Sequence, residues 1–233
     1  MDKQTVRTQM LLGKDAVCSL SSRHVAVFGI GGVGSFCAEA LARAGVGHIT
    51  LVDDDTVSVS NLNRQLVALH STVGMAKTDV MAQRIHDISP QCQVRVMTAR
   101  YEPQNREAFF TQPYDYIADC IDSVACKTDL IVSALERNTP IISAMGTGNK
   151  LDPTKFEITD LSKTSGCPLA RVMRRELKKQ GIVHHTVLYS TEQALTPLFQ
   201  PDPGSNVPGS VAWVPSCAGL MMAGYIIRQL LHI

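Results

Sequence analysis

The chain has 233 residues, a formal net charge of +1 and 45% hydrophobic residues. This composition suits one large domain with a substantial core and excludes an intrinsically disordered chain. The seven cysteines include no C-x-x-C pair, and the N-terminus has no apolar signal core. We therefore expect a cytoplasmic protein without a structural zinc site.

Residues 1–150 alternate between short apolar runs and helical patterns. The apolar runs predict strands over residues 24–29, 48–53, 94–97, 116–120 and 140–144. Helical spacing predicts helices over residues 33–44, 75–88, 105–111 and 127–138. Such alternation favours a doubly wound, Rossmann-like α/β fold, with a mostly parallel sheet and helices on both faces.

The pattern changes in residues 151–210, which we expect to form an insertion. It predicts an antiparallel strand over residues 155–161, a basic helix over 168–180 and a strand over 186–189. Residues 191–209 hold four prolines and two glycines, which is typical of a mobile loop. Residues 211–233 then return to the main domain, as a strand over 211–214 and a helix over 216–231. The chain is thus expected to end in an antiparallel and helical extension.

The last of these segments is also the one membrane candidate in the sequence. Residues 211–231 are apolar and nearly uncharged, but Pro215 interrupts them. The remainder is short for a span of ~20 residues. We therefore expect a buried helix and no stable membrane insertion.

A glycine motif follows the first predicted strand and opens the first predicted helix. Its glycines are Gly29, Gly31, Gly32 and Gly34. They permit a tight turn and close approach of a phosphate, at which the free N–H groups of the helix would point. Asp53 lies about 20 residues further on, as a ribose-binding carboxylate would. The alternative is a glycine turn that serves packing alone.

Polar residues after the second predicted strand favour ATP over NAD as the nucleotide. Asn61, Arg64, Gln65 and Lys77 follow Asp53 in sequence. Arginine and lysine neutralise phosphate charge, and three phosphates need more positive charge than the pyrophosphate of NAD. The set favours ATP. An NAD-dependent oxidoreductase and a non-catalytic nucleotide-binding scaffold remain as alternatives.

Two aspartates lie at the carboxyl end of the strand over residues 116–120, where open α/β sheets place ligands. Asp122 lies beyond the apolar run and is the candidate ligand for Mg²⁺ on phosphate oxygens, or else a cap of the next helix. Asp119 is interpreted as structural. The glycines of residues 144–150 would allow carbonyl groups to hold a monovalent cation, although a plain turn has the same composition.

The motifs G-I-G-G-V-G, D-D-D-T-V-S-V-S-N-L-N-R-Q, V-G-M-A-K and D-C-I-D-S resemble the adenylating domain of ubiquitin-activating enzymes and of the bacterial ThiF/MoeB-like activators of sulfur-carrier proteins. The resemblance implies that Asp53 binds ribose and that Asp122 serves magnesium. It implies phosphate or nucleotide contacts for Asp55, Asn61, Arg64, Gln65, Lys77 and Ser123. It also implies a homodimer, in which Arg7 reaches into the partner subunit's site.

The rest of the chain is similar to one branch of that superfamily, the tRNA threonylcarbamoyladenosine dehydratases. The segments are K-L-D-P-T at 150, D-L-S-K-T at 160, P-L-A-R-V-M-R-R-E-L at 168 and P-G-S at 208. The resemblance implies ATP-dependent cyclisation of threonylcarbamoyladenosine in tRNA, through adenylation of its carboxylate by residues 1–150. The alternative is an adenylyltransferase for the C-terminal Gly-Gly of a small sulfur carrier. A sulfur-transfer protein partner stays open.

The basic helix is the expected tRNA contact within residues 151–210. Residues 150–185 carry eight Lys or Arg against four Asp or Glu. Arg171, Arg174, Arg175 and Lys178 have the i, i+3, i+4, i+7 spacing of one helix face, which would follow phosphates. The alternative is a solvated face. Cys167 precedes this helix and has no evident base, so its role as an acyl acceptor stays open.

Overall fold

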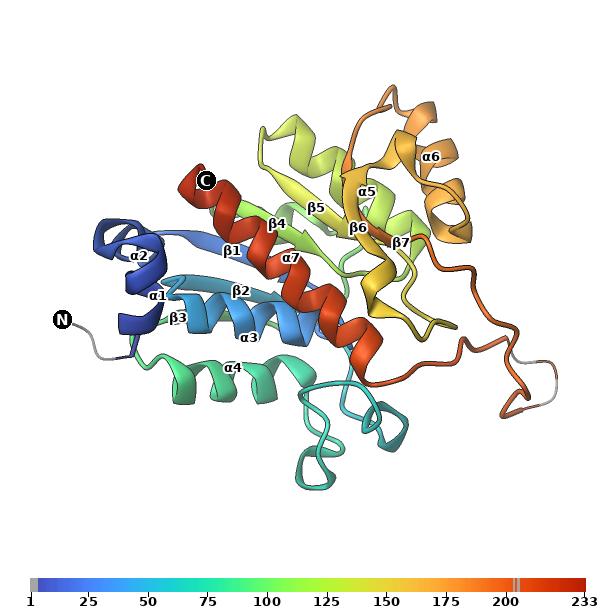
Figure 1. Cartoon of the computed structure of the whole chain (residues 1–233), viewed down its shortest axis with the longest axis horizontal. Coiled ribbons are helices and arrows are strands. Elements are labelled where there is room, and N and C mark those ends of the chain that lie inside the picture. Colours follow the sequence, from blue (N-terminus) through green and yellow to red (C-terminus); the bar gives the residue numbers. More distant parts are fainter. Residues whose placement is uncertain (1–3, 203, 205) are drawn as a thin grey trace.

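A seven-stranded sheet in the order β3-β2-β1-β4-β5-β7-β6 forms the centre of the molecule (Figure 1). The computed structural model describes residues 4–202, 204 and 206–233. Every pairing is parallel except that of β6 with β7. The strands are β1 (His24–Phe28), β2 (His48–Val52), β3 (Gln93–Met97), β4 (Tyr116–Asp119), β5 (Ile141–Ala144), β6 (Phe156–Asp160) and β7 (Thr186–Ser190).

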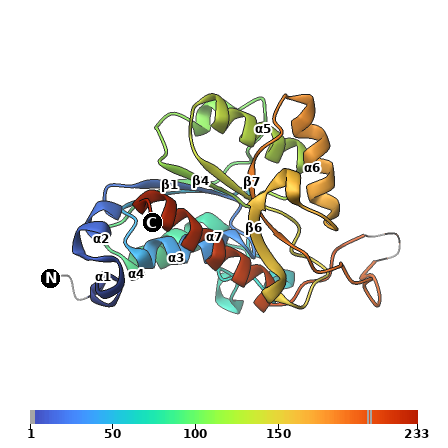
Figure 2. The ribbon, with the colours of Figure 1, turned by 45° about the horizontal axis from the view of Figure 1, so that its top comes forward.

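Helices cover both faces of this sheet, as Figure 2 shows. They are α1 (Val6–Leu12), α2 (Lys14–Leu20), α3 (Gly34–Ala44), α4 (Lys77–Ile88), α5 (Val124–Glu136), α6 (Pro168–Lys179) and α7 (Trp213–Leu231). α5 and α6 lie above the sheet, and α3, α4 and α7 lie below it. One apolar cluster forms on each side. The predicted doubly wound α/β fold is confirmed.

The topology places a ligand site at the ends of β1 and β4. The strand order reverses between these two neighbours, because β2 and β3 lie on one side of β1 and β5 follows β4 on the other. In open α/β sheets, ligands bind at such a switch point, beyond the carboxyl ends of the strands. The loops after Phe28 and Asp119 are therefore the first place to look for a site.

The segment 105–111 forms less helix than expected. Only Arg106–Phe109 is helical, as a 3-10 helix. Starting a helix is costly, and the chain must reach Tyr116 of β4 within a few residues, so a single turn is all that this segment forms. Two short helices that the sequence did not suggest, α1 and α2, precede β1.

The expected strand over residues 211–214 is wrong, because α7 already begins at Trp213. Pro215 lies in the first helical turn, where no N–H is needed for the helical ladder, so it does not interrupt the helix. α7 is long and apolar enough to cross a membrane by length and composition alone. Its apolar side chains pack instead against α3 and the sheet, and a Cβ at Gly219 would lie 2.2 Å from the carbonyl oxygen of Val33.

Residues 151–210 extend the sheet at one edge. β7 pairs in parallel with β5, and β6 returns antiparallel to β7 with Ile158 opposite Leu188. α6 packs beside α5 on the same face. The described residues between β7 and α7 contain no helix or strand, and this segment projects from the body of the molecule on the right of Figure 1.

Candidate active site

The glycine turn after β1 is shaped by close backbone contacts. Gly29 has a φ of +88°, and a Cβ there would lie 2.7 Å from the carbonyl oxygen of Cys120 beyond β4. A Cβ at Gly34 would lie 1.7 Å from the carbonyl oxygen of Gly29. Only glycine fits at these two positions, so the end of β1, the end of β4 and the start of α3 come together.

Asp53 joins the end of β2 to this turn. Its Oδ2 accepts the N–H of Ile30 at 2.6 Å, and its Oδ1 accepts the N–H of Asp55 at 2.9 Å. Burial raises the pKa of Asp53, although these two donors and the charge of Lys77 act in the opposite direction. The carboxylate therefore stands at the edge of the turn, in the position expected for a ribose contact.

Lys77 is buried at the start of α4 and is held by acidic residues. Its Nζ lies 2.7 Å from Asp55 Oδ2 and 3.9 Å from Asp53 Oδ1. Asp53, Asp54 and Asp55 bring one carboxylate oxygen each within 4.8 Å of one another. The ammonium group of Lys77 already provides positive charge to this group, so the three aspartates do not by themselves indicate a metal site.

The S-N-L-N-R-Q segment forms a second side of the site. Asn61 Oδ1 accepts the N–H of Ser58 at 3.0 Å, which fixes the start of a short 3-10 helix (Val59–Asn61). Arg64 Nη1 donates to the carbonyl oxygen of Ser60 and to Asn63 Oδ1, both at 2.9 Å. Burial lowers the pKa of the Arg64 guanidinium. Gln65 Oε1 is buried and has no hydrogen-bond partner among the described residues.

The D-C-I-D-S segment after β4 divides its two aspartates between structure and site. Asp119 is fully buried, and its Oδ1 accepts the N–H of Ile121 at 3.1 Å. Its Oδ2 lies 2.8 Å from Nζ of Lys127, which is also fully buried. Asp119 is thus structural, as predicted. Asp122 is exposed and has no ion pair within the part of the chain that the structure describes. Ser123, not Asp122, occupies the N-cap position of α5.

Lys127 helps to hold the segment after β4 in place, and the sequence analysis did not identify it. It shares the apolar face of α5 with Leu130, Ile131 and Ala134, at the spacing of a buried stripe. A lysine in that register needs a buried partner, and this signal was available in the sequence. The pair fixes the segment that presents Asp122 and Ser123.

These elements enclose a cavity of about 610 Å³, within the range of small-molecule sites. The predicted site residues that line it are Gly29, Gly31, Gly32, Asp53, Asp55, Asn61, Arg64, Gln65, Lys77, Asp122 and Ser123. Gly34 does not line the cavity, but it packs against the backbone of Gly29 and so shapes the turn. The cavity brings a glycine cradle, two cations and an unpaired carboxylate together, which suits a nucleotide with several phosphates.

Comparison with known proteins gives the family of the chain. The ThiF family matches residues 4–233. The chain belongs to the ThiF family. A tRNA threonylcarbamoyladenosine dehydratase of Bacillus subtilis is 43% identical over 98% of this chain and 94% of its own length. This chain therefore belongs with the threonylcarbamoyladenosine dehydratases of that family.

Two solved structures give the same result. A crystal structure of Escherichia coli tRNA N6-threonylcarbamoyladenosine dehydratase in complex with ATP has a TM-score of 0.90 and 36% identity, covering 99% of this chain and 94% of that chain. The complex of the same enzyme with AMP has a TM-score of 0.91 and 36% identity, covering 100% and 96%. The mostly parallel fold is thus that of a ThiF family enzyme.

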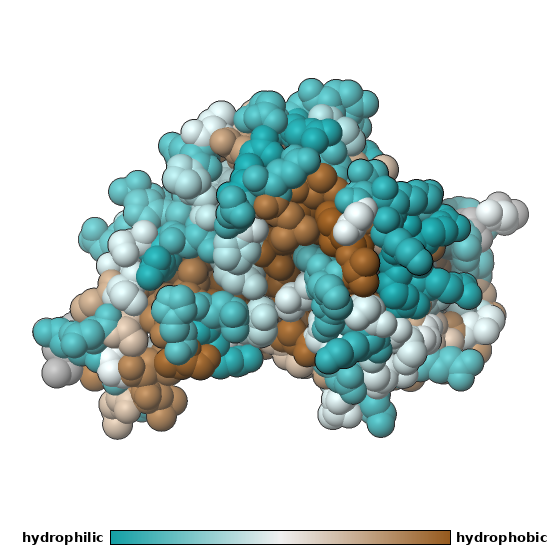
Figure 3. All heavy atoms as spheres, turned by 90° about the horizontal axis from the view of Figure 1, so that it is seen from above, coloured by the Kyte–Doolittle hydropathy of each residue, from teal (hydrophilic) through white to brown (hydrophobic). Residues whose placement is uncertain are grey.

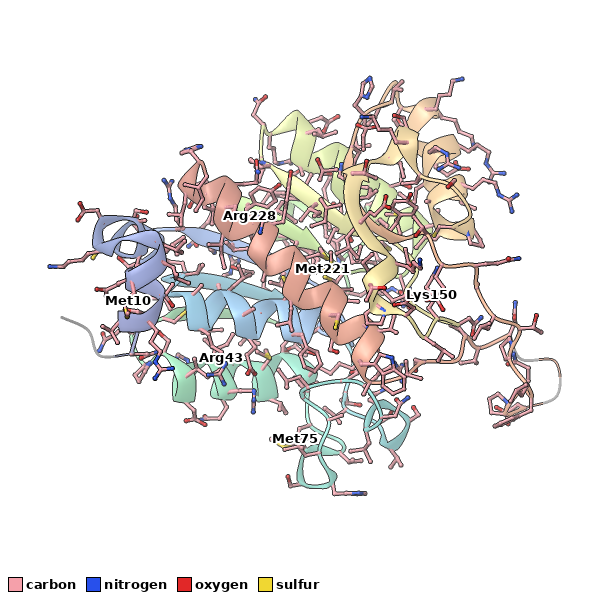
Figure 4. The ribbon with its side chains drawn as sticks, viewed as in Figure 1. Met10, Arg43, Met75, Lys150, Met221 and Arg228 are labelled. Carbon is pink, nitrogen blue, oxygen red and sulfur yellow. The ribbon has the colours of Figure 1, made fainter. Side chains whose placement is uncertain are left out.

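Arg7 lies apart from the cavity in its own chain. It is an exposed residue of α1 and does not line the cavity. Figure 4 places Met10, of the same helix, on the far left of the molecule and Lys150 on the right. Met10 and Leu11 are 80% and 86% exposed. A role for Arg7 in a ThiF family site would therefore require a second subunit.

The basic helix α6 begins at the cavity. Its four predicted cations do not all point to solvent. Leu169, in its first turn, lines the cavity. Arg171, Arg175 and Lys178 are exposed, whereas Arg174 turns inward and donates to the carbonyl oxygen of Thr164 at 2.8 Å. From the side of α5 and α6 the surface is largely hydrophilic, with apolar side chains gathered near its middle and at its lower left (Figure 3). The exposed stripe therefore has three members of the predicted four.

The cavity also includes residues for which the sequence analysis predicted no nucleotide contact. Ala144 ends β5, residues 145–148 follow it, and residues 208–210 precede α7. Leu169 and Pro215 also line the cavity. Only the tertiary fold brings these distant segments together. Cys167 is buried at the N-cap of α6 and does not line the cavity, so its thiol does not face the candidate site.

Proposed function

We propose that this protein is an ATP-dependent tRNA threonylcarbamoyladenosine dehydratase. The observation that carries the proposal is the cavity that joins the glycine turn, Asp53, Arg64, Lys77 and Asp122 in one chain. The similarity to named dehydratases over nearly the whole chain supplies the substrate. The alternative, a sulfur-carrier adenylyltransferase, has less support, because the relatives that match over the full length are dehydratases.

ATP suits the residues of the cavity. The glycine turn leaves room for phosphates beside the N-terminus of α3, and Asp53 offers ribose a carboxylate. Arg64 and Lys77 supply positive charge, and Gln65 lines the cavity beside them. Asn61, Asp55 and Ser123 complete the polar lining. An NAD-dependent redox site would not need the two cations.

The chemistry that follows is carboxylate activation. An oxygen of the threonyl carboxylate attacks the α-phosphorus of ATP, and pyrophosphate leaves. The carbamoyl group of the same side chain then attacks the acyl carbon and expels AMP and a proton, giving the cyclic nucleoside. The chain's residues position the reactants and neutralise charge, and no protein nucleophile is needed.

Asp122 is the residue that would hold Mg²⁺ on the phosphates. It lines the cavity, it is exposed and no described cation pairs with it, so its carboxylate is free for a hard cation. The metal would supply charge neutralisation there. A monovalent cation held by carbonyl groups of residues 144–150 is a weaker proposal, because the carbonyl of Asn149 already accepts the N–H of Leu195 at 2.8 Å.

Partners follow from the same proposal. The tRNA would contact the exposed stripe of α6 that begins beside the cavity. A second copy of the chain would contribute its Arg7, and the exposed Met10 and Leu11 of the same helix support an interface there. A tRNA substrate and ATP fit a cytoplasmic enzyme. A sulfur-transfer protein as partner has no structural support in the described residues.

Nucleoside mass spectrometry tests the function directly. Purified protein is incubated with Mg-ATP and tRNA that carries threonylcarbamoyladenosine. The tRNA is then digested, and the masses of its nucleosides are measured. We expect the loss of one water from that nucleoside, only with ATP. If the nucleoside is untouched while a protein carboxylate supports pyrophosphate exchange, the adenylyltransferase alternative holds.

A further inference from the structure

Residues 208–210 form one wall of the cavity, and Asn149 holds it. All three line the cavity. The N–H of Asn149 donates to the carbonyl oxygen of Gly209 at 2.7 Å, and the N–H of Gly209 donates to Asn149 Oδ1 at 2.6 Å. The carbonyl oxygen of Asn149 accepts the N–H of Leu195 at 2.8 Å. Asn149 is therefore hydrogen-bonded to both ends of the projecting segment, at Leu195 where the segment begins and at Gly209 where it ends.

The backbone at residues 148 and 149 is shaped for this contact. Asn149 has a φ of +59°, in the left-handed region that asparagine and glycine tolerate best. A Cβ at Gly148 would lie 2.7 Å from Cβ of Pro208, so only glycine lets Pro208 pack there. The adjacent Lys150, buried and labelled in Figure 4, donates to the carbonyl oxygen of Glu192 at 2.6 Å. The anchor is thus built from consecutive residues.

The wall is also tied to a proposed phosphate contact. Nδ2 of Asn63 donates to the carbonyl oxygen of Ser210 at 3.0 Å. Oδ1 of the same side chain accepts Nη1 of Arg64 at 2.9 Å. The wall therefore lies between Asn149 on one side and the segment of Arg64 on the other. The nucleotide is assigned to the glycine turn and Asp53, which leaves the wall and the start of α6 for the acyl substrate.

We propose that Asn149 is a positioning residue that holds residues 208–210 beside the acyl adenylate and so keeps water from it. The inference rests on the proposed function. Water that attacks the acyl carbon breaks its bond to AMP and returns the carboxylate, with AMP and two protons released. Attack by the carbamoyl group breaks the same bond but yields the cyclic nucleoside, AMP and one proton. Excluding water favours the second route.

The test is the amount of AMP formed for each cyclic nucleoside, using the full chain, Mg-ATP and tRNA carrying threonylcarbamoyladenosine. Asn149→Gly permits the left-handed backbone and removes the side-chain acceptor. Losing one such hydrogen bond should raise the amount of AMP formed in excess of the cyclic nucleoside by roughly threefold to tenfold, and so raise the ratio above one. Asn149→Asp keeps an oxygen acceptor and should restore a ratio near one. Gly148→Ala, which displaces Pro208, should raise it as Asn149→Gly does.

A matched control is available in Asn138, an exposed residue after α5 that also has a left-handed backbone, with a φ of +54°. Asn138→Gly should leave the ratio at about one. An unchanged ratio in both Asn149→Gly and Gly148→Ala overturns the inference. Failure of the proposed function is seen separately, because the unmutated chain would then form no cyclic nucleoside, and the inference would fall with it.

Discussion

At the scale of single residues, the candidate site contains cations that the chain itself holds in place. Lys77 is 5% exposed and is held by Asp55 at 2.7 Å, so its ammonium group is already oriented at the edge of the cavity. Preorganised charge of this kind is most effective where water is excluded. Arg64 is held similarly, by Ser60 and Asn63.

Replacing Lys77 should therefore affect the reaction more than the fold. We expect Lys77→Ala to lower ATP–pyrophosphate exchange by roughly a hundredfold or more, because charge on the phosphates loses its partner. Circular dichroism should show an intact fold. Lys14→Ala, on the exposed surface of α2, serves as the control. Near-normal exchange in Lys77→Ala would remove Lys77 from the phosphate site.

The burial of His185 predicts that stability depends on pH. It is buried, and its Nε2 lies 2.8 Å from Ser143 Oγ. Burial and the nearby charge of Lys127 lower the pKa of His185 to about 4, against an ordinary value of 6.5. As the pH falls below 6.5, His185 binds a proton in the unfolded chain but stays neutral in the folded chain until about pH 4. The His185 contribution to the free energy of unfolding should therefore fall by about 1.4 kcal/mol per pH unit between those two values.

Urea denaturation at several pH values checks this. His185→Gln keeps a hydrogen-bonding group opposite Ser143 but does not titrate, so its stability should depend less steeply on pH between about 6.5 and 4. Parallel curves for the variant and the unmutated chain would contradict the assignment of this pH dependence to His185.

At the scale of elements, α6 combines a structural face with a binding face. Ala170, Met173 and Leu177 are buried, and Arg174 is bound to the turn at Thr164. The remaining cations face solvent. Sequence spacing alone put Arg174 among them, because helical periodicity gives the direction of a side chain but not the neighbour that it meets.

Charge reversal should separate the two faces. We expect Arg171→Glu combined with Arg175→Glu to weaken tRNA binding by roughly tenfold or more and to reduce its salt dependence, with ATP affinity unchanged. Lys14→Glu, a single charge reversal of the same kind on α2, is the control. Filter binding over a salt series measures the effect. Unchanged tRNA affinity in the double variant would make the stripe ordinary solvated surface.

At the scale of the whole molecule, the candidate site in one chain contains Arg64 and Lys77 but not Arg7. Mixing variants tests whether Arg7 comes from a partner. Arg7→Ala and Lys77→Ala, each inactive alone, should recover about a quarter of full activity after random subunit exchange, because half of the dimers are mixed and each has one complete site. Arg64→Ala mixed with Lys77→Ala should recover nothing, since these residues share a cavity. No recovery in the first mixture would exclude Arg7 acting across subunits.

Much of this protein was determined by its sequence. The alternation of apolar runs and helical spacing led to the parallel sheet, because those periods follow from how strands and helices bury one face. The glycine turn with Asp53, Asn61, Arg64 and Lys77 led to the candidate nucleotide site, since a glycine turn, a carboxylate about 20 residues on and nearby cations suit a nucleotide. The start of α7 was misplaced, because a local pattern does not show that Pro215 lies in a first turn.

Tertiary structure alone decided which distant segments meet. Asn149, Gly209 and Asn63 are far apart in the chain and become neighbours only when β5, the end of the projecting segment and the loop after β2 converge at the cavity. Lys127 and Asp119 likewise form a pair only because α5 packs on β4. The physical reason is that sequence periodicity records which face of an element is buried, whereas hydrogen bonds between elements depend on their positions in three dimensions.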